Sequence, residues 1–180
     1  MLYNLLPQFK VVEINNVAAL RMGHIIAQTP AKAGEVATYE VKNSKQEVIA
    51  KFLENGVIVG YDKSGYLKNY SSTEHTQPCL VYTEELITAN MTGGLDQFAN
   101  EFDANGVVYP RVLPLNLGDA FTTNNVSEIK DGYAYVSNGV LTIDETYTAG
   151  KHMFIAKVSD LPAGQEAVEF TYIGLASASN

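Results

Sequence analysis

Tyr133-Ala-Tyr-Val-Ser137, Asn138-Gly139 and Val140-Leu-Thr-Ile143 make up the stretch that decides the fold. Asn-Gly between alternating residues is a strong short-range signal for a β-hairpin, because both residues tolerate the positive φ of a type I′ turn. Tyr133 and Tyr135 share one face of the incoming strand, and Val140 alternates with Thr142 in the outgoing one. The stretch therefore predicts a two-stranded antiparallel unit.

The Asn-Gly pair occurs twice more, as Asn55-Gly56 and Asn105-Gly106. Residues 48–54 and 57–61, on either side of the first pair, are rich in the β-branched and aromatic residues that suit strands. We therefore predict a second hairpin here. The third pair precedes another apolar run, in which Pro110 cannot donate to a ladder and so predicts an edge strand, a bulge or a strand end.

Four further strands are predicted at residues 36–41, 80–83, 153–158 and 167–173. Short strands with little helical periodicity between them are typical of a mainly β fold, here a small antiparallel β-sandwich or β-barrel. The spacing of Leu95, Phe98, Ala99 and Phe102 predicts one short helix, which Thr92 would cap. So short a helix must lay its apolar face on the sheet or on another subunit.

The length of 180 residues fits a single domain, and 46% hydrophobic against 18% charged residues indicates a globular chain. Cys79 is the only cysteine, so no intramolecular disulfide can form. Residues 1–30 are apolar without a clean period, and we expect either an ordinary first strand or an arm that docks on a neighbouring subunit. Pro30 and Gly34 predict a break between this N-terminal segment and a single β-rich domain at residues 31–180.

The net charge of -8 makes a nucleic-acid partner unexpected. Residues 1–90 hold nine acids and eight bases, whereas residues 91–180 hold eleven acids and four bases. No apolar run reaches the roughly 18 residues of a membrane span, and no basic residue precedes the first apolar cluster as in a secretory signal. We expect neither a membrane partner nor secretion.

Signatures of catalysis are missing from the sequence. The phosphate-binding glycine patterns and the G-x-S-x-G pentad are absent, and Ser64 lies in an ordinary turn signal. His24, His75 and His152 are far apart, and His75 with Cys79 lacks a second local ligand pair. We therefore expect no enzymatic activity, no cofactor and no metal.

Two possibilities for ligand chemistry stay open. Acids could meet across a cleft as a glycosidase pair, although adjacent acids on a strand point to opposite faces. A cluster of tyrosines and lysines could offer stacking and charge to a ligand, or form a sheet edge or a subunit contact. The acids are Glu84, Glu85, Asp96, Glu101, Asp103, Asp144 and Glu145, and the cluster is Tyr61, Lys63, Tyr66, Lys68 and Tyr70.

Four segments follow one another in a recognisable order. They are Pro78-Cys-Leu-Val-Tyr-Thr-Glu-Glu85, Thr92-Gly-Gly-Leu-Asp-Gln-Phe-Ala99, Tyr109-Pro-Arg-Val-Leu-Pro-Leu115 and Gly118-Asp-Ala-Phe-Thr-Thr-Asn124. This run resembles small structural proteins of tailed bacteriophages, of the head decoration or head-fibre type. It covers about a quarter of the chain.

The resemblance implies a homo-oligomeric virion protein, made in the host bacterial cytoplasm and located on the capsid surface. It would bind the major capsid protein, either to cement the head or as the base of a head fibre. An N-terminal arm could order on the capsid by β-addition, with Leu2, Tyr3, Leu5, Leu6 and Phe9 as the partner-binding residues. The alternatives are a β-fold carbohydrate-binding or depolymerising module, a tail or connector component, and an interaction domain of a cellular complex.

Overall fold

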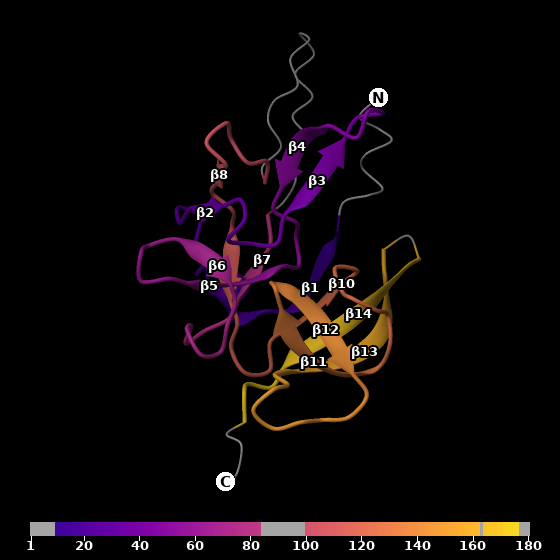
Figure 1. Cartoon of the computed structure of the whole chain (residues 1–180). Helices are drawn as coiled ribbons and strands as arrows, with labels where there is room; N and C mark the ends of the chain where they lie inside the picture. The colour runs from indigo at the N-terminus through magenta and orange to yellow at the C-terminus, as the bar shows by residue number, and fades with distance from the viewer. Residues whose placement is uncertain (1–9, 84–99, 163, 177–180) are drawn as a thin grey trace.

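The computed structural model describes residues 10–83, 100–162 and 164–176. Within these residues strands dominate, and the one helix, α1, covers only Ala18–Arg21. The prediction of a mainly β fold with one short helix is therefore confirmed. The strands form two six-stranded sheets and a separate two-stranded hairpin (Figure 1).

Sheet A is fully antiparallel and lies in the lower half of Figure 1. The sheet curls around one core: Val12 and Ile14 at one end of the sheet pack against the same core that buries Leu141 and Ile143 at the other end. Its strands in spatial order are β1 (Val12–Asn16), β10 (Ala120–Thr123), β14 (Gln165–Tyr172), β13 (Phe154–Leu161), β11 (Gly132–Ser137) and β12 (Val140–Asp144).

Sheet B is antiparallel except for the parallel pair β2 and β6. Ile26, which precedes β2 in the chain, bridges Val112 at the opposite end of the sheet through two backbone hydrogen bonds of 3.1 and 2.9 Å. This bridge closes the sheet around its own core. The strands in spatial order are β8 (Val107–Val108), β2 (Ala31–Lys32), β6 (Leu67–Asn69), β5 (Ile58–Tyr61), β7 (Cys79–Val81) and β9 (Val112–Pro114).

Neighbouring residues on the strands of sheet B serve two different cores, as the alternation of side chains across a strand requires. Ile58, Leu80 and Leu113 pack with the sheet A residues in the first core. Val59, Val81 and Val112, each adjacent in sequence to one of them, pack in a second core on the other face of sheet B. Both faces of sheet B are therefore buried, and one of them joins it to sheet A.

The hairpin at Asn138-Gly139 is confirmed. Ser137 pairs with Val140, so the loop has two residues, and φ is 49° at Asn138 and 82° at Gly139, as a type I′ turn requires. The prediction at Pro110 is also confirmed. The strand before it, β8, lies at the edge of sheet B and ends at Val108.

The hairpin predicted at Asn55-Gly56 is wrong, although strands lie on both sides of the turn. The incoming strand β4 (Val48–Phe52) pairs with β3 (Tyr39–Lys42), whereas the outgoing strand β5 pairs with β6 and β7. The Asn55 side chain accepts the Thr83 N–H at 2.9 Å and donates to the Thr83 carbonyl at 3.1 Å. This non-local pairing fixes the turn against the chain after β7, so the two strands enter different sheets.

The predicted strands at 36–41, 80–83, 153–158 and 167–173 correspond to β3, β7, β13 and β14. The predicted helix lies largely outside the described residues, which resume at Asn100. Its last residues are not helical: Glu101 bridges Phe52 of β4, and the Phe102 N–H donates to the Lys51 carbonyl at 2.9 Å. The side chain of Phe102 is buried in the second core, so strand pairing with β4 determines this segment.

The N-terminal segment is described from Lys10 onward. Its β1 forms an edge of sheet A by pairing with β10, and Val17 and Ala19 are buried in the first core. The predicted partner-binding residues lie outside the described residues; they are Leu2, Tyr3, Leu5, Leu6 and Phe9.

Candidate binding pocket at the junction of the sheets

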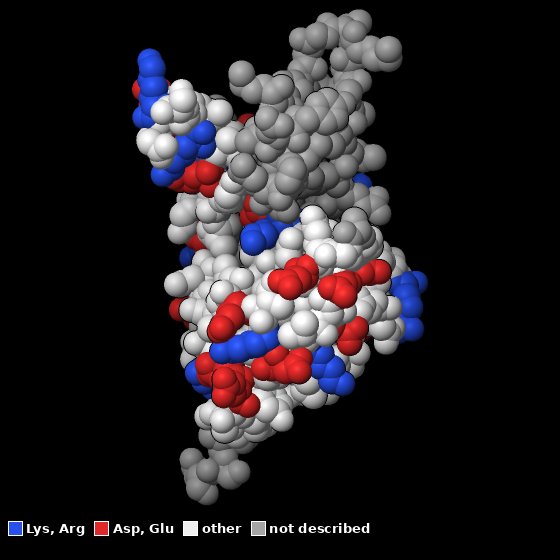
Figure 2. Space-filling model, turned by 90° about the vertical axis from the view of Figure 1, so that its right-hand side faces the viewer, with Lys and Arg blue, Asp and Glu red and all other residues white. Residues whose placement is uncertain are grey.

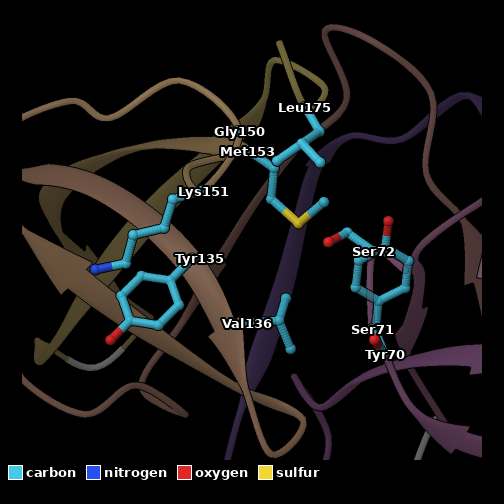
Figure 3. Close-up of a pocket in the computed structure, with 9 residues that line it drawn as sticks. All are labelled: Tyr70, Ser71, Ser72, Tyr135, Val136, Gly150, Lys151, Met153 and Leu175. Carbon is cyan, nitrogen blue, oxygen red and sulfur yellow. The ribbon is translucent and has the colours of Figure 1, made fainter. Parts of the chain in front are cut away.

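A cavity of about 310 Å³ opens where sheet A meets the end of β6 in sheet B (Figure 3). The segment after β6 forms one wall and the segment before β13 forms the other, with β11 between them. The lining residues are Tyr70, Ser71, Ser72, Tyr135, Val136, Gly150, Lys151, Met153 and Leu175.

The pocket exists because β13 leaves β11 before β11 ends. The two strands pair only from Gly132 to Ala134, and the last contact is the Met153 N–H to the Ala134 carbonyl at 2.9 Å. One residue earlier, the His152 N–H turns back to the Thr148 carbonyl at 3.1 Å. The rest of β11, from Tyr135 to Ser137, therefore borders the cavity.

A histidine holds the turn that diverts the chain. Nδ1 of His152 accepts the Thr148 N–H at 2.8 Å, and Nε2 lies 3.0 Å from the carboxylate of Asp144. A ring nitrogen that accepts an N–H carries no proton, so His152 is the neutral tautomer and donates from Nε2 to Asp144. The side chain is fully buried and contacts the rings of Tyr133, Tyr135 and Tyr147.

The opposite wall repeats the same construction. Nδ1 of His75 accepts the Ser71 N–H at 2.9 Å, and the His75 N–H donates to the Ser71 carbonyl at 2.9 Å. The ring packs on Gly60 of β5, where an added Cβ would lie 2.3 Å from Cγ of His75. Each wall is thus a five-residue turn, Ser71–His75 or Thr148–His152, that begins with a hydroxyl residue and closes on a histidine.

The charges around the pocket compensate one another. Nζ of Lys151 lies 2.5 Å from the Asp144 carboxylate and 4.0 Å over the ring of Tyr135. The hydrogen bond from Lys151 is the main cause that lowers the pKa of Asp144, and the hydrogen bond from His152 is the second cause. Asp144 in turn raises the pKa of Lys151. Tyr70 is on the wall formed by the segment after β6. Burial is the main cause that raises its pKa to about 12, with smaller effects of Tyr172 and Cys79, so the phenol of Tyr70 stays neutral.

Both wall histidines are tied into their turns through Nδ1. Nδ1 of each wall histidine is occupied by a backbone N–H, so it cannot accept a proton from a serine hydroxyl. The hydroxyl of Ser71 pairs instead with that of Thr73 at 2.9 Å. The lining combines apolar and aromatic residues with the hydroxyls of Ser71 and Ser72 and the side chain of Lys151.

Among the described carboxylates considered for glycoside hydrolysis, Asp144 and Asp103 are engaged by other groups, and Glu145 is exposed. Asp144 bonds to Lys151 and His152, and Asp103 accepts the N–H groups of Asn105 and Val107 within its own turn. Glu101 belongs to the bridge with Phe52. Glu84, Glu85 and Asp96 lie outside the described residues.

The tyrosine and lysine cluster is dispersed by the fold, and only Tyr70 lines the pocket. Lys68 bonds to Asp62 at 2.6 Å, and Lys32 lies 4.1 Å over the ring of Tyr66. Tyr61 is partly exposed on β5.

Cys79 is buried, and burial raises the pKa of its thiol to about 12, so it is an inert core residue. Among the residues that the structure describes, no group of three His, Cys, Asp or Glu side chains could hold a metal ion.

The pocket walls were not predicted from the sequence. The available signal is the repeated spacing of Ser71-Ser-Thr-Glu-His75 and Thr148-Ala-Gly-Lys-His152. A hydroxyl residue four positions before a histidine is common by chance, so the repetition becomes informative only when both turns lie at one cavity.

The Gly118–Asn124 run has a structural role, because its side chains hold the segment that begins at Lys10. Asp119 accepts the Ala18 N–H at 2.9 Å. Thr123 donates its hydroxyl to the Val11 carbonyl at 2.7 Å, and Asn124 accepts the Val11 N–H at 2.8 Å. We call this run the β1 clasp.

The face of sheet A seen in Figure 2 carries acidic and basic side chains interspersed with uncharged ones. No helix in residues 10–83, 100–162 and 164–176 is long and apolar enough to cross a membrane.

Comparison with known family models, curated proteins and solved structures gives no match to this chain.

Proposed function

We propose that this chain is a non-enzymatic structural protein of a tailed-phage head, which binds the major capsid protein as a homo-oligomer. The observation that carries the proposal is the succession of four sequence segments between Pro78 and Asn124, which resembles head proteins of tailed phages. Decoration of the capsid and service as a head-fibre base are both compatible with it.

The anchoring of the N-terminal segment supports attachment through an arm. The Lys10 N–H donates to Glu54 at 2.6 Å, and the β1 clasp holds the residues that follow. A segment that precedes Lys10 therefore starts from a fixed point on a β-rich body. Short apolar segments attached in this way can add to a partner's sheet or fill its grooves.

The use made of the two buried histidines supports an interaction role. Both are used as hydrogen-bond acceptors that shape turns, and Asp144 is compensated by Lys151. These residues stabilise the shape of the pocket walls, and specific interfaces depend on close shape complementarity.

Co-sedimentation with capsids tests the proposal. The purified chain would be mixed with capsids from its source that lack it, and with capsids that already carry a full complement. We expect saturable binding only to the bare capsids, at a fixed ratio to the capsid subunit. Absence of binding to bare capsids would refute the proposal.

The predicted arm is tested by replacing all five apolar side chains with serine: Leu2, Tyr3, Leu5, Leu6 and Phe9. We expect capsid binding to fall at least about tenfold, a loss of about 1.4 kcal/mol. Because β1 pairs with β10 after Lys10, the thermal unfolding midpoint should stay close to that of the parent chain. Undiminished binding would assign attachment to another surface.

A further inference from the structure

We propose that the pocket at the junction of the sheets binds an extended polypeptide segment, which pairs with the free edge of β11 at Val136 and inserts one uncharged side chain. This inference is independent of the proposed function, since it depends only on the geometry of β11 and of the two histidine turns.

The backbone of Val136 provides the pairing. In a hairpin with a two-residue loop, the residues that flank the loop form a hydrogen-bonded pair, so Ser137, Tyr135 and Tyr133 direct their backbone groups to β12. Val136 directs its N–H and C=O to the opposite edge. There β13 has ended its pairing at Ala134, and no described residue bonds to the backbone of Val136.

An extended chain fits this edge better than other ligand classes do. A donor and an acceptor on one extended residue match the acceptor and donor of a residue on a second antiparallel strand. Strand addition at a free edge obtains affinity from such pairs and specificity from pockets for alternate side chains. The place that a continued β13 would have occupied beside Val136 is vacated by the Thr148–His152 turn.

The lining selects an uncharged side chain. Val136 and Leu175 contribute apolar groups to the lining, and Ser71 and Ser72 contribute hydroxyls, as Figure 3 shows. The Lys151 ammonium is engaged with Asp144 on the far side of Tyr135, so the lining holds no uncompensated charge. A charged side chain would enter without a compensating partner, which is unfavourable. The volume of about 310 Å³ is at the small end of ligand pockets, consistent with one side chain.

Nuclear magnetic resonance of the full ¹⁵N-labelled chain tests the inference. The probes are capped pentapeptides of the sequence Thr-Val-X-Val-Thr, with X as Phe, Leu, Lys or Asp, and a Phe peptide N-methylated at X. We expect saturable shifts of the Val136, Lys151 and Ser72 amides with X as Phe or Leu. Affinity should be at least about tenfold weaker with Lys, Asp or the N-methylated residue.

Matched serine-to-tryptophan variants provide the control. Ser72 is exposed on the pocket wall, so Ser72→Trp should fill the cavity and abolish the shifts. Ser44 is exposed in the β3–β4 turn, so Ser44→Trp should bind as the parent chain does. Equal responses to all peptides, no saturable response, or binding unaffected by Ser72→Trp would overturn the inference. So would a saturable response to neutral monosaccharides alone.

Discussion

At the scale of single residues, His152 combines full burial with two hydrogen bonds of opposite sense. His152→Leu fills the same buried space with an apolar side chain, but it leaves the Thr148 N–H without its acceptor. A buried donor that loses its partner costs about 1–3 kcal/mol. We expect a loss of this size in the free energy of unfolding, measured by urea titration.

The exposed His24 supplies the control for this substitution, because His24→Leu should change stability by less than about 0.5 kcal/mol. His152→Asn should recover part of the loss, since its amide oxygen can accept the same N–H. Equal stability of the Leu and Asn variants would contradict the role of Nδ1 as an acceptor.

The lowered pKa of Asp62 makes the stability of the fold depend on pH. Its hydrogen bond with Lys68, followed by that with Ser64, holds its pKa at about 2, below the ordinary value of about 3.9. A carboxyl whose pKa is lower in the folded state stabilises the fold above the unfolded pKa. That contribution is lost as the pH falls from about 4 to about 2.

The unfolding midpoint of Asp62→Asn, compared with that of the parent chain, isolates this contribution. We expect a small decrease at pH 7, because the pair is at the surface, and convergence of the two midpoints toward pH 2. A difference that is constant across this range would refute the assignment.

At the scale of elements, the β1 clasp determines how firmly β1 is held at the edge of sheet A. Thr123→Val combined with Asn124→Ala removes the two side chains that bond to Val11, each worth about 1 kcal/mol. Local opening should then speed amide exchange in β1 by roughly ten- to thirtyfold, with β13 and β14 unchanged.

Thr142→Val on β12 is the matched control and should leave exchange in β1 unchanged. Uniformly faster exchange throughout sheet A in the double variant would show that the clasp supports the whole sheet rather than its edge strand.

The two Asn-Gly turns show which elements could be predicted from the sequence. Asn138-Gly139 forms a hairpin because its strands pair across the turn itself. Asn55-Gly56 has the same local chemistry, but its side chain bonds to Thr83, 28 residues away. Local propensity therefore predicts where strands lie, whereas pairing depends on contacts that the local sequence does not contain.

At the scale of the whole molecule, the shared core predicts a single cooperative unfolding transition. Phe121 lies in the first core and Leu67 in the second, and both are fully buried. Phe121→Ala and Leu67→Ala should each lower the free energy of unfolding by about 2–5 kcal/mol.

Far-ultraviolet circular dichroism and the near-ultraviolet tyrosine signal should move together in both variants. Two separate transitions, or a loss confined to one signal, would show that sheets A and B unfold independently despite their common core.

The pocket could not be predicted from the sequence, because its lining comes from four distant places in the chain. Tyr70, Tyr135, Lys151 and Leu175 meet only after sheets A and B have packed. Individual features were accessible, such as the buried Cys79 and the tyrosine-rich faces. The lining residues meet only because β13 stops pairing with β11 at Ala134. The alternation of apolar residues in the sequence does not determine where this pairing stops.

Several sheet edges end on a single bridging residue: Ile26 beside β9, Glu101 beside β4, and Val126 beside β12. Each bridge covers part of a strand that would otherwise offer an uninterrupted row of backbone groups to another molecule. A template for fibril growth needs such a row over several residues. These bridges therefore shorten the row of backbone groups that β9, β4 and β12 could offer for stacking against a second chain.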